Sequence, residues 1–324
     1  MQFKGACTPI HEKRNEPEEL TQLERLRTRL PTDHPQYGTV SKKYHQAKAG
    51  YTGELYVDRV LNEIAFPQGT TILKDITLEI NPDFLIQIDT FIISPSIAFL
   101  LEIKNFTGTV HFDENSGKTT KISPYGETEK YDCVIHQLDR AAIGLTEWLR
   151  QRNINIPIEP ILIMANNNTE IPKFPNAVTL KYAKQLPRYI RKFISDEPKL
   201  TAKQIRQITQ IINQNRRKWW NDRACKRYKI SPNELKRGVL CPTCNEPATR
   251  VRGHSWYCRS CKKNTKDALQ QSIDDWFLLV SPTITNRQLR LFLDLKSSSA
   301  ASVILRQTNL RRHGASRNTT YTKP

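Results

Sequence analysis

Residues 85–106 read LIQIDTFIISPSIAFLLEIKNF and predict two strands joined by a tight turn. β-branched and other apolar residues fill both halves, and Pro95 and Ser96 stand between them as a two-residue loop. In the register that such a loop imposes, Asp89 on the first strand faces Glu102 on the second. The stretch therefore predicts a hairpin that brings two carboxylates together.

The second of these strands carries a pair of oppositely charged residues. Glu102 and Lys104 are two residues apart and point to one face, whereas Leu101 and Ile103 point to the other. Facing carboxylates destabilise a sheet unless a cation lies between them, and a divalent metal held by one or two carboxylates fills that role. Lys104 would then orient an attacking water or stabilise the transition state. An ordinary solvated face is the alternative interpretation.

The flanking sequence predicts an α/β domain over residues 45–195. Apolar residues at helical spacing over residues 50–65 come first, and Glu54 in this helix is a further candidate for the charged site. The helical period returns over residues 132–150, and residues 159–165 have the composition of a buried strand. Between the helices lie consecutive strand-like runs, expected to be antiparallel, over residues 71–80, 85–94, 97–106 and 108–112.

The motifs of this domain resemble those of the nuclease-related domain, NERD, in the PD-(D/E)xK restriction-endonuclease-like superfamily. The resemblance covers roughly residues 45–165 and rests on AGYTGE at 49–54, QID at 87–89, LEIKNFTG at 101–108 and Gln137. It implies a restriction-endonuclease-like core, a mixed sheet flanked by helices, and a DNA nuclease dependent on Mg2+ or Mn2+. The residues carried over to the active site are Glu54, Asp89, Glu102, Lys104 and Gln137, with Asp89 and Glu102 as the metal ligands.

Gln137 fits the family pattern less closely than the other four residues. Its local sequence is CVIHQ, which lacks the proline associated with the start of this helix in the family. An exposed glutamine on a helix surface is therefore an equally good interpretation of this position.

Two cysteine pairs of identical spacing predict a structural zinc site. Cys241 and Cys244 form one CxxC pair, Cys258 and Cys261 form the other, and thirteen residues separate the pairs. Four thiolates at this spacing close a tetrahedron around Zn2+ and leave no position for a catalytic water. The segment resembles the zinc ribbons of nucleic-acid enzymes. Trp256 and Tyr257 are interleaved with basic residues expected to contact phosphate, which are Arg250, Arg252, Arg259, Lys262 and Lys263.

The C-terminal segment predicts two short helices and a basic hairpin. Residues 285–295 and 300–310 show helical spacing on either side of the turn KSSS, a pattern typical of helix-turn-helix proteins. The RRHGASRNTTYTK stretch that follows resembles the wing of a winged helix. A small helical bundle that caps the chain is the alternative. The expected phosphate-binding residues are Arg306, Arg311, Arg312 and Arg317.

Charge is distributed unevenly along the 324 residues, whose formal net charge is +18. Residues 1–180 hold 19 basic and 23 acidic residues, whereas residues 181–324 hold 31 basic and 9 acidic ones. Such asymmetry favours a near-neutral core module joined to a module that binds a polyanion, because lysine and arginine displace the counterions of phosphates. A solvated basic surface is the simpler alternative.

The sequence also indicates the cellular compartment in which we expect the protein. No apolar run is long enough to span a bilayer, and residues 1–20 lack the apolar core of a signal peptide. We therefore expect a cytoplasmic protein whose seven cysteines are metal ligands or free thiols.

Together the patterns divide the chain into five expected segments. They are a disordered and helical N-terminal extension at 1–44, the NERD domain at 45–195, a basic helical linker at 196–235, a four-cysteine zinc ribbon at 236–266 and a helix-turn-helix or winged-helix-like segment at 267–324.

The predicted function is metal-dependent hydrolysis of DNA phosphodiester bonds in DNA processing or repair. The alternative is a DNA-binding adaptor or regulator whose nuclease-like fold is inactive or depends on a partner, and an RNA enzyme is a third possibility. Because the chain lacks a GxxxxGK[ST] loop, a helicase or ATPase partner would have to supply any motor activity.

Overall fold

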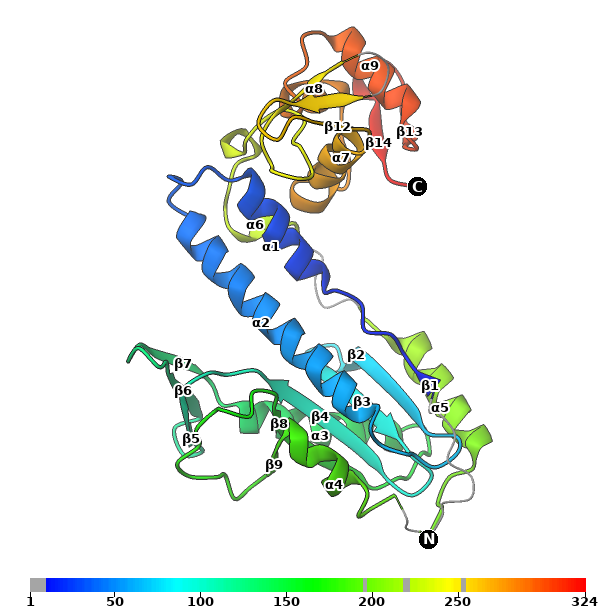
Figure 1. Cartoon of the computed structure of the whole chain (residues 1–324). Helices are drawn as coiled ribbons and strands as arrows, with labels where there is room; N and C mark the ends of the chain where they lie inside the picture. Colours follow the sequence, from blue (N-terminus) through cyan, green and yellow to red (C-terminus); the bar gives the residue numbers. More distant parts are fainter. Residues whose placement is uncertain (1–9, 195–196, 218–221, 252–254) are drawn as a thin grey trace. The chain divides into compact units, whose positions relative to one another are not determined.

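The computed structural model describes residues 10–194, 197–217, 222–251 and 255–324 (Figure 1). The chain forms two compact units. The first unit consists of residues 1–15 and 49–220, and the second of residues 16–48 and 221–324. Helix α2 (Tyr37–Leu61) contributes residues to both. None of the helices in the described part of the chain combines the length and apolarity needed to cross a membrane.

A six-stranded mixed sheet forms the centre of the first unit, as the sequence predicts. Strands β2, β3 and β4 are consecutive and antiparallel, whereas β1 runs parallel to β2, and β8 and β9 continue parallel to β4. The change to parallel pairing follows from the crossover helix between β4 and β8. The strands, in sheet order, are β1 (Ile10–His11), β2 (Thr71–Asn81), β3 (Phe84–Ile93), β4 (Ala98–Lys104), β8 (Ile158–Met164) and β9 (Thr179–Tyr182).

The β3–β4 hairpin has the predicted register. Ser94 N donates to Ile97 O at 3.0 Å around the two-residue loop, and the ladder runs outward from there to the pair Thr90 and Leu101. The ladder ends one pair before Asp89 and Glu102. Beyond that point the two strands no longer pair, which opens the sheet beside both carboxylates.

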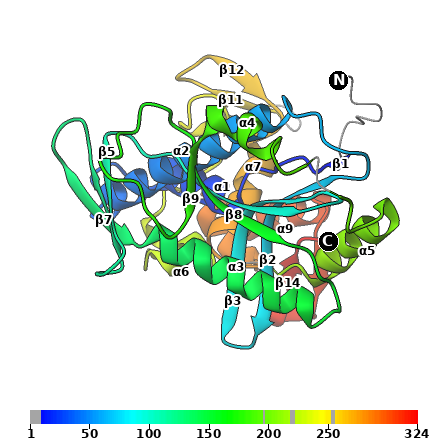
Figure 2. The ribbon, with the colours of Figure 1, turned by 90° about the horizontal axis from the view of Figure 1, so that it is seen from below.

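Helices cover both faces of the sheet. Helix α3 (Val134–Arg150) buries a stripe that includes Leu138, Leu145 and Trp148 against one face, joined by apolar residues of α5 (Ala202–Asn215). The other face packs against the second half of α2 and the short elements η1 (Ala183–Gln185) and α4 (Leu186–Ile190). Figure 2 shows α3 and α4 on opposite sides of the sheet.

Gly144 allows α3 to approach the sheet closely. A Cβ at this position would lie 2.8 Å from Ile86 Cγ2, so any larger residue would push the helix away from β3.

A small antiparallel sheet is inserted between β4 and α3. It consists of β5 (Thr109–Asp113), β6 (Lys118–Ile122) and β7 (Thr128–Asp132), of which the sequence predicts only the first. Gly108 begins the insertion at φ +83°, and a Cβ there would lie 2.1 Å from the carbonyl oxygen of Ile122. Only glycine fits this turn.

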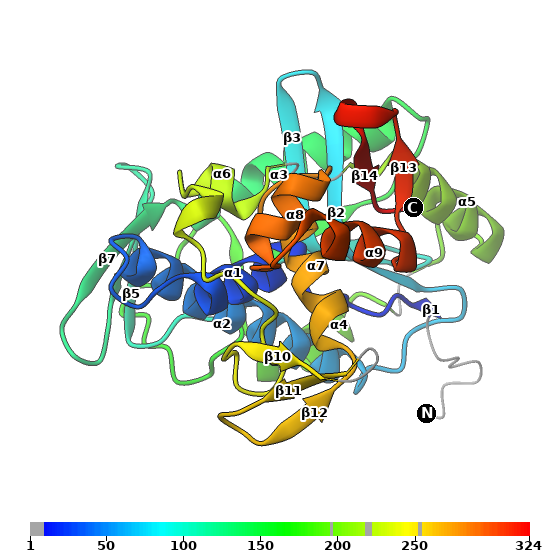
Figure 3. The ribbon, with the colours of Figure 1, turned by 90° about the horizontal axis from the view of Figure 1, so that it is seen from above.

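The second unit combines a three-stranded ribbon with short helices and a C-terminal hairpin (Figure 3). Helix α9 is followed directly by the antiparallel pair β13 and β14. The elements are α1 (Glu18–Arg29), α6 (Ala224–Arg227), η2 (Pro232–Glu234), β10 (Ala248–Arg250), β11 (Trp256–Cys258), β12 (Lys263–Thr265), α7 (Ala268–Leu279), α8 (Asn286–Phe292), α9 (Ser298–Gln307), β13 (Arg311–His313), η3 (Ser316–Asn318) and β14 (Thr320–Thr322).

A buried ion-pair network joins α1 to α7. Arg25 and Arg29 both donate to the carboxylate of Asp275, at 2.6 Å each, and Arg29 also donates to the carbonyl oxygen of Lys236. Asp275 and Arg29 are fully buried, so the loss of either one leaves an uncompensated charge in the core of this unit. Helix α1 is therefore an integral part of the second unit.

Candidate active site and cysteine cluster

Strand β4 and helix α3 bring together three of the residues predicted for the active site. Glu102 is 1% exposed, and its Oε1 lies 2.6 Å from Lys104 Nζ. Lys104 also donates to Gln137 Oε1 at 3.2 Å. Gln137 lies in the first turn of α3, so this hydrogen bond fixes the Lys104 ammonium between a strand and a helix.

Asp89 lies where the β3–β4 ladder ends. Its Oδ2 accepts a hydrogen bond from Ile103 N at 2.7 Å, in the place where a backbone carbonyl would otherwise continue the ladder. Burial, with the neighbouring Asp89 carboxylate, raises the pKa of Glu102 to about 7 against the opposing effect of Lys104. Burial disfavours the Lys104 ammonium, but Glu102 and Asp89 outweigh it and raise the pKa of this group. Lys104 is therefore a cation at neutral pH.

Glu54 projects from α2 and contacts a different cation. Its Oε2 accepts a hydrogen bond from Arg14 Nη1 at 3.0 Å. Burial and the nearby Asp89 carboxylate raise the pKa of Glu54 to about 8, although Arg14 acts in the opposite direction. Glu54 therefore interacts electrostatically with Asp89, and its side chain is held in place by Arg14 from the N-terminal segment.

Arg14 is a residue that sequence reasoning missed. The sequence predicts a disordered and helical extension over residues 1–44, yet β1 joins the sheet in this segment and the Arg14 side chain is completely buried. Its guanidinium donates to Asp58 at 3.0 Å and to Asp75 at 2.7 Å, as well as to Glu54. It also donates to the carbonyl oxygen of Asp89 at 3.0 Å. No motif marks this position, because its partners lie on three separate elements.

Strand β2 has a local irregularity at Asp75, next to Arg14. Asp75 has φ 51°, and the ladder with β3 skips this residue between Lys74 and Ile76. Burial raises the pKa of Asp75 to about 6 despite its contact with Arg14. Lys74 Nζ lies 3.0 Å from Asp58 Oδ2, so the same region contains a second internal cation.

The donor set fits a hard divalent cation such as Mg2+ or Mn2+. Five interacting carboxylates face three cations, so negative charges outnumber positive ones by two when all are ionised. Burial and this excess of negative charge raise the pKa values of Glu54, Asp75 and Glu102, and a divalent cation would relieve the repulsion. The carboxylates are Glu54, Asp58, Asp75, Asp89 and Glu102, and the cations are Arg14, Lys74 and Lys104.

Two carboxylates could hold such an ion. Within the described ranges no three carboxylates gather closely enough to form a multidentate metal site. Asp89 and Glu102 interact with each other and with Lys104, and Mg2+ binds through one or two carboxylates and completes its shell with waters or substrate oxygens.

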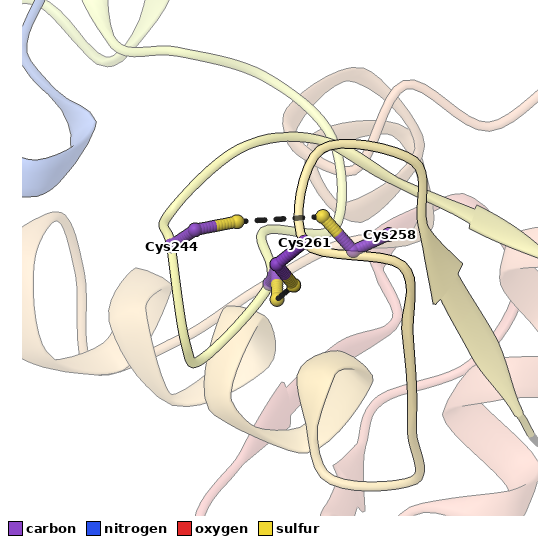
Figure 4. Close-up of side chains that lie close together, drawn as sticks. Cys244, Cys258 and Cys261 are labelled. Atoms are coloured by element: carbon purple, nitrogen blue, oxygen red, sulfur yellow. Dashed lines mark hydrogen bonds between the residues drawn. The ribbon is translucent and has the colours of Figure 1, made fainter.

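The four cysteines converge as the spacing predicts. Their sulfurs all lie within 4.8 Å of one another, with Cys241 and Cys261 3.6 Å apart and Cys244 and Cys258 3.4 Å apart (Figure 4). Four cysteine sulfurs gathered this closely form the ligand set of a structural zinc site. The cluster can therefore bind a metal such as zinc.

The basic residues predicted to contact DNA are solvent-exposed where the structure describes them. Those of the ribbon are Arg250, Arg259, Lys262 and Lys263, and those of the C-terminal helix and hairpin are Arg306, Arg311 and Arg312. Arg252 and the side chain of Arg317 lie outside the described residues. Trp256, which the sequence places among these basic residues, is 6% exposed, so its ring belongs to the ribbon core and is not available to pack on a base or ribose.

Comparison with protein families identifies a part of the first unit. Residues 49–165 match the model of the nuclease-related domain, NERD. The match includes Glu54, Asp89, Glu102, Lys104 and Gln137, but it excludes Arg14 and the cysteine cluster. No curated protein and no solved structure matches this chain significantly. The family match, the mixed sheet and the opened hairpin agree, and residues 49–165 of this chain are therefore a nuclease-related domain.

Proposed function

We propose that this protein is a metal-dependent nuclease that hydrolyses phosphodiester bonds of DNA. The observation that supports it most strongly is the buried Glu102–Lys104 pair beside Asp89, inside the segment that matches the nuclease-related domain. Buried carboxylates with raised pKa values next to a lysine are typical of catalytic sites and are costly in a purely structural sheet.

Each residue of the site has a role in this proposal. Asp89 and Glu102 hold Mg2+ or Mn2+, and such an ion supplies an activated water and neutralises charge on the phosphate. Lys104, cationic and fixed by Gln137, orients the water or donates a hydrogen bond to the phosphate oxygens as their charge develops. Glu54, held by Arg14, adds negative charge beside Asp89.

The second unit delivers the nuclease to DNA in this proposal. Cys241, Cys244, Cys258 and Cys261 bind one structural Zn2+, and exposed arginines and lysines of the ribbon contact phosphates. Helix α9 and the β13–β14 hairpin act like the recognition helix and wing of a winged helix. Arg306 and Arg312 support this role, because both line a hollow of about 520 Å³ between that helix and the hairpin.

Cleavage assays test the proposal directly. Wild-type protein is incubated with linear, nicked and single-stranded DNA in Mg2+ or Mn2+, next to Asp89→Asn and the matched control Asp83→Asn, which alters an exposed carboxylate in the β2–β3 turn. The proposal predicts metal-dependent cutting that Asp89→Asn abolishes and Asp83→Asn retains. Intact DNA binding without cutting by wild type would instead favour a DNA-binding adaptor.

A further inference from the structure

A groove lies next to the candidate active site, between the first half of β3 and the first half of α3. We call it the β3–α3 groove; it has a volume of about 520 Å³, within the usual range for ligand pockets. The side chains that matter to the argument are Phe84, Leu85 and Gln87 from β3, and His136, Gln137 and Arg140 from α3.

The groove is connected to the site through both of its walls. Gln137 lines the groove and accepts the hydrogen bond from Lys104. On the opposite wall, Gln87 precedes Asp89 by two residues on the same strand, a separation of about 7 Å. A chain bound in the groove would therefore lead directly to the Asp89 and Lys104 side chains.

The open hairpin leaves this part of β3 accessible. β3 pairs with β2 along nearly its whole length, but β4 pairs only with residues 90–93. Leu85 is consequently 41% exposed, an unusual position for a large apolar side chain inside a strand of a central sheet. The groove thus offers an apolar surface that the fold itself does not cover.

The chemistry of the lining combines apolar, amide and cationic groups. The Arg140 guanidinium lies 5.4 Å from the centre of the Phe84 ring, and no described residue forms an ion pair or hydrogen bond with it. The one carboxylate of the groove, Asp132, is paired with Lys118 at 2.9 Å. Arg140 therefore remains available to an anionic ligand.

We propose that the β3–α3 groove binds an unpaired DNA strand beside the scissile phosphodiester bond. Unpaired bases expose faces that can pack on Leu85 and Phe84, whereas the bases of a duplex cover one another's faces. Arg140 contacts a phosphate, and Gln87 and Gln137 hydrogen bond to base edges or sugar oxygens. The inference rests on the proposed function and narrows it to DNA with a single-stranded segment at the cut site.

Photocrosslinking locates the strand. The probe is a thymidine hexanucleotide that carries one 5-iodouracil, added to the full-length protein without Mg2+ or Mn2+, so that the result does not depend on cleavage. Crosslinks are expected on the peptides that contain residues 84–87 and 136–140. Crosslinks confined to the second unit would overturn the inference, even if the protein proved to be a nuclease.

Variants separate the phosphate contact from the base contact. Arg140→Gln should weaken hexanucleotide binding about three- to tenfold and reduce the slope of log affinity against log salt by about 0.7. Leu85→Ser should weaken binding by a similar factor without changing that slope, because it removes an apolar contact. Both positions are exposed, so neither substitution threatens the fold.

The matched control is Arg150→Gln in the last turn of the same helix. It also removes one positive charge from α3, but at the end of the helix that lies far from the groove. It should leave crosslinking and affinity unchanged. Equal losses in Arg140→Gln and Arg150→Gln, or no loss in Arg140→Gln and Leu85→Ser, would refute the groove as a strand-binding site.

Discussion

The two candidate metal sites of this chain hold charge in different ways. The cysteine cluster draws its four sulfurs from residues 241–261, within two adjacent loops of one small ribbon. The carboxylate cluster is assembled from the N-terminal segment, α2, β2, β3 and β4, and it contains cations of its own. The first is therefore a local site and the second a product of the whole first unit.

This contrast defines what each metal would do. Four thiolates crowded together repel one another strongly without a metal, so zinc becomes part of the folding free energy of the ribbon. Arg14, Lys74 and Lys104 balance three of the five carboxylate charges, so the first unit can fold without Mg2+ and can exchange it. We expect metal removal to unfold the ribbon and to leave the nuclease-related domain folded.

Loss of the cysteine ligands should have the largest effect on stability. Cys241→Ser with Cys244→Ser should abolish zinc binding and unfold residues 240–265, since structural zinc contributes about 10–16 kcal/mol in comparable peptides. Zinc content and amide hydrogen exchange of β10–β12 measure the change. Cys225→Ala is the matched control, because this cysteine is buried outside the cluster. If the amides of β10–β12 stay protected in zinc-free protein, the ribbon folds without its metal and the two sites do not differ in this respect.

Replacing Arg14, which contacts three of the five carboxylates, should have the next largest effect. Arg14→Gln leaves three carboxylates without their buried partner and should cost about 3–5 kcal/mol of unfolding free energy in the first unit. Arg216→Gln is a matched control, since that arginine pairs with Glu12 but is 23% exposed and contacts none of the five carboxylates; it should cost about 1 kcal/mol or less.

Hydrogen exchange of β2 and β3 during denaturant titration measures both variants. Equal destabilisation by Arg14→Gln and Arg216→Gln would show that Arg14 is an ordinary structural arginine and that the cluster does not depend on its own cations.

The stability of the metal-free first unit should fall as pH rises through the range of the shifted carboxyl groups. Glu54 and Glu102 have folded-state pKa values of about 8 and about 7, above the ordinary 4.5, so the protons they retain stabilise the fold at low pH. That contribution is complete below about pH 4.5 and is lost by about pH 8. Added Mg2+ should replace the protons and restore stability at pH 8 but change little at pH 5.

Thermal unfolding at the two pH values, with and without Mg2+, measures this effect. Asp89→Asn should reduce both the pH dependence and the response to Mg2+, whereas Asp83→Asn should change neither. If adding Mg2+ does not change the melting temperature of the wild type at pH 8, this result would argue against a cation site at Asp89 and Glu102.

The same contrast explains which features the sequence predicts. The cysteine cluster and the β3–β4 register follow from local patterns, a repeated CxxC spacing and a two-residue loop between apolar runs. Arg14 could not be predicted, because its burial depends on carboxylates that lie 40 to 61 positions away in the chain. The sequence does not predict the short strands β6 and β7 either. Their residues are mostly polar and half-exposed, so the alternation of apolar and polar residues that marks a strand is absent.

The most direct test of the central claim separates metal binding from catalysis at Lys104. Lys104→Met keeps Asp89 and Glu102, and the control Lys130→Met alters an exposed lysine of β7. We expect Lys104→Met to bind one Mn2+ like the wild type, as followed by electron paramagnetic resonance, and to cleave DNA about 100- to 1,000-fold more slowly. Cleavage by Lys104→Met at the rate of the wild type and of Lys130→Met would contradict the assignment of this site as the catalytic centre.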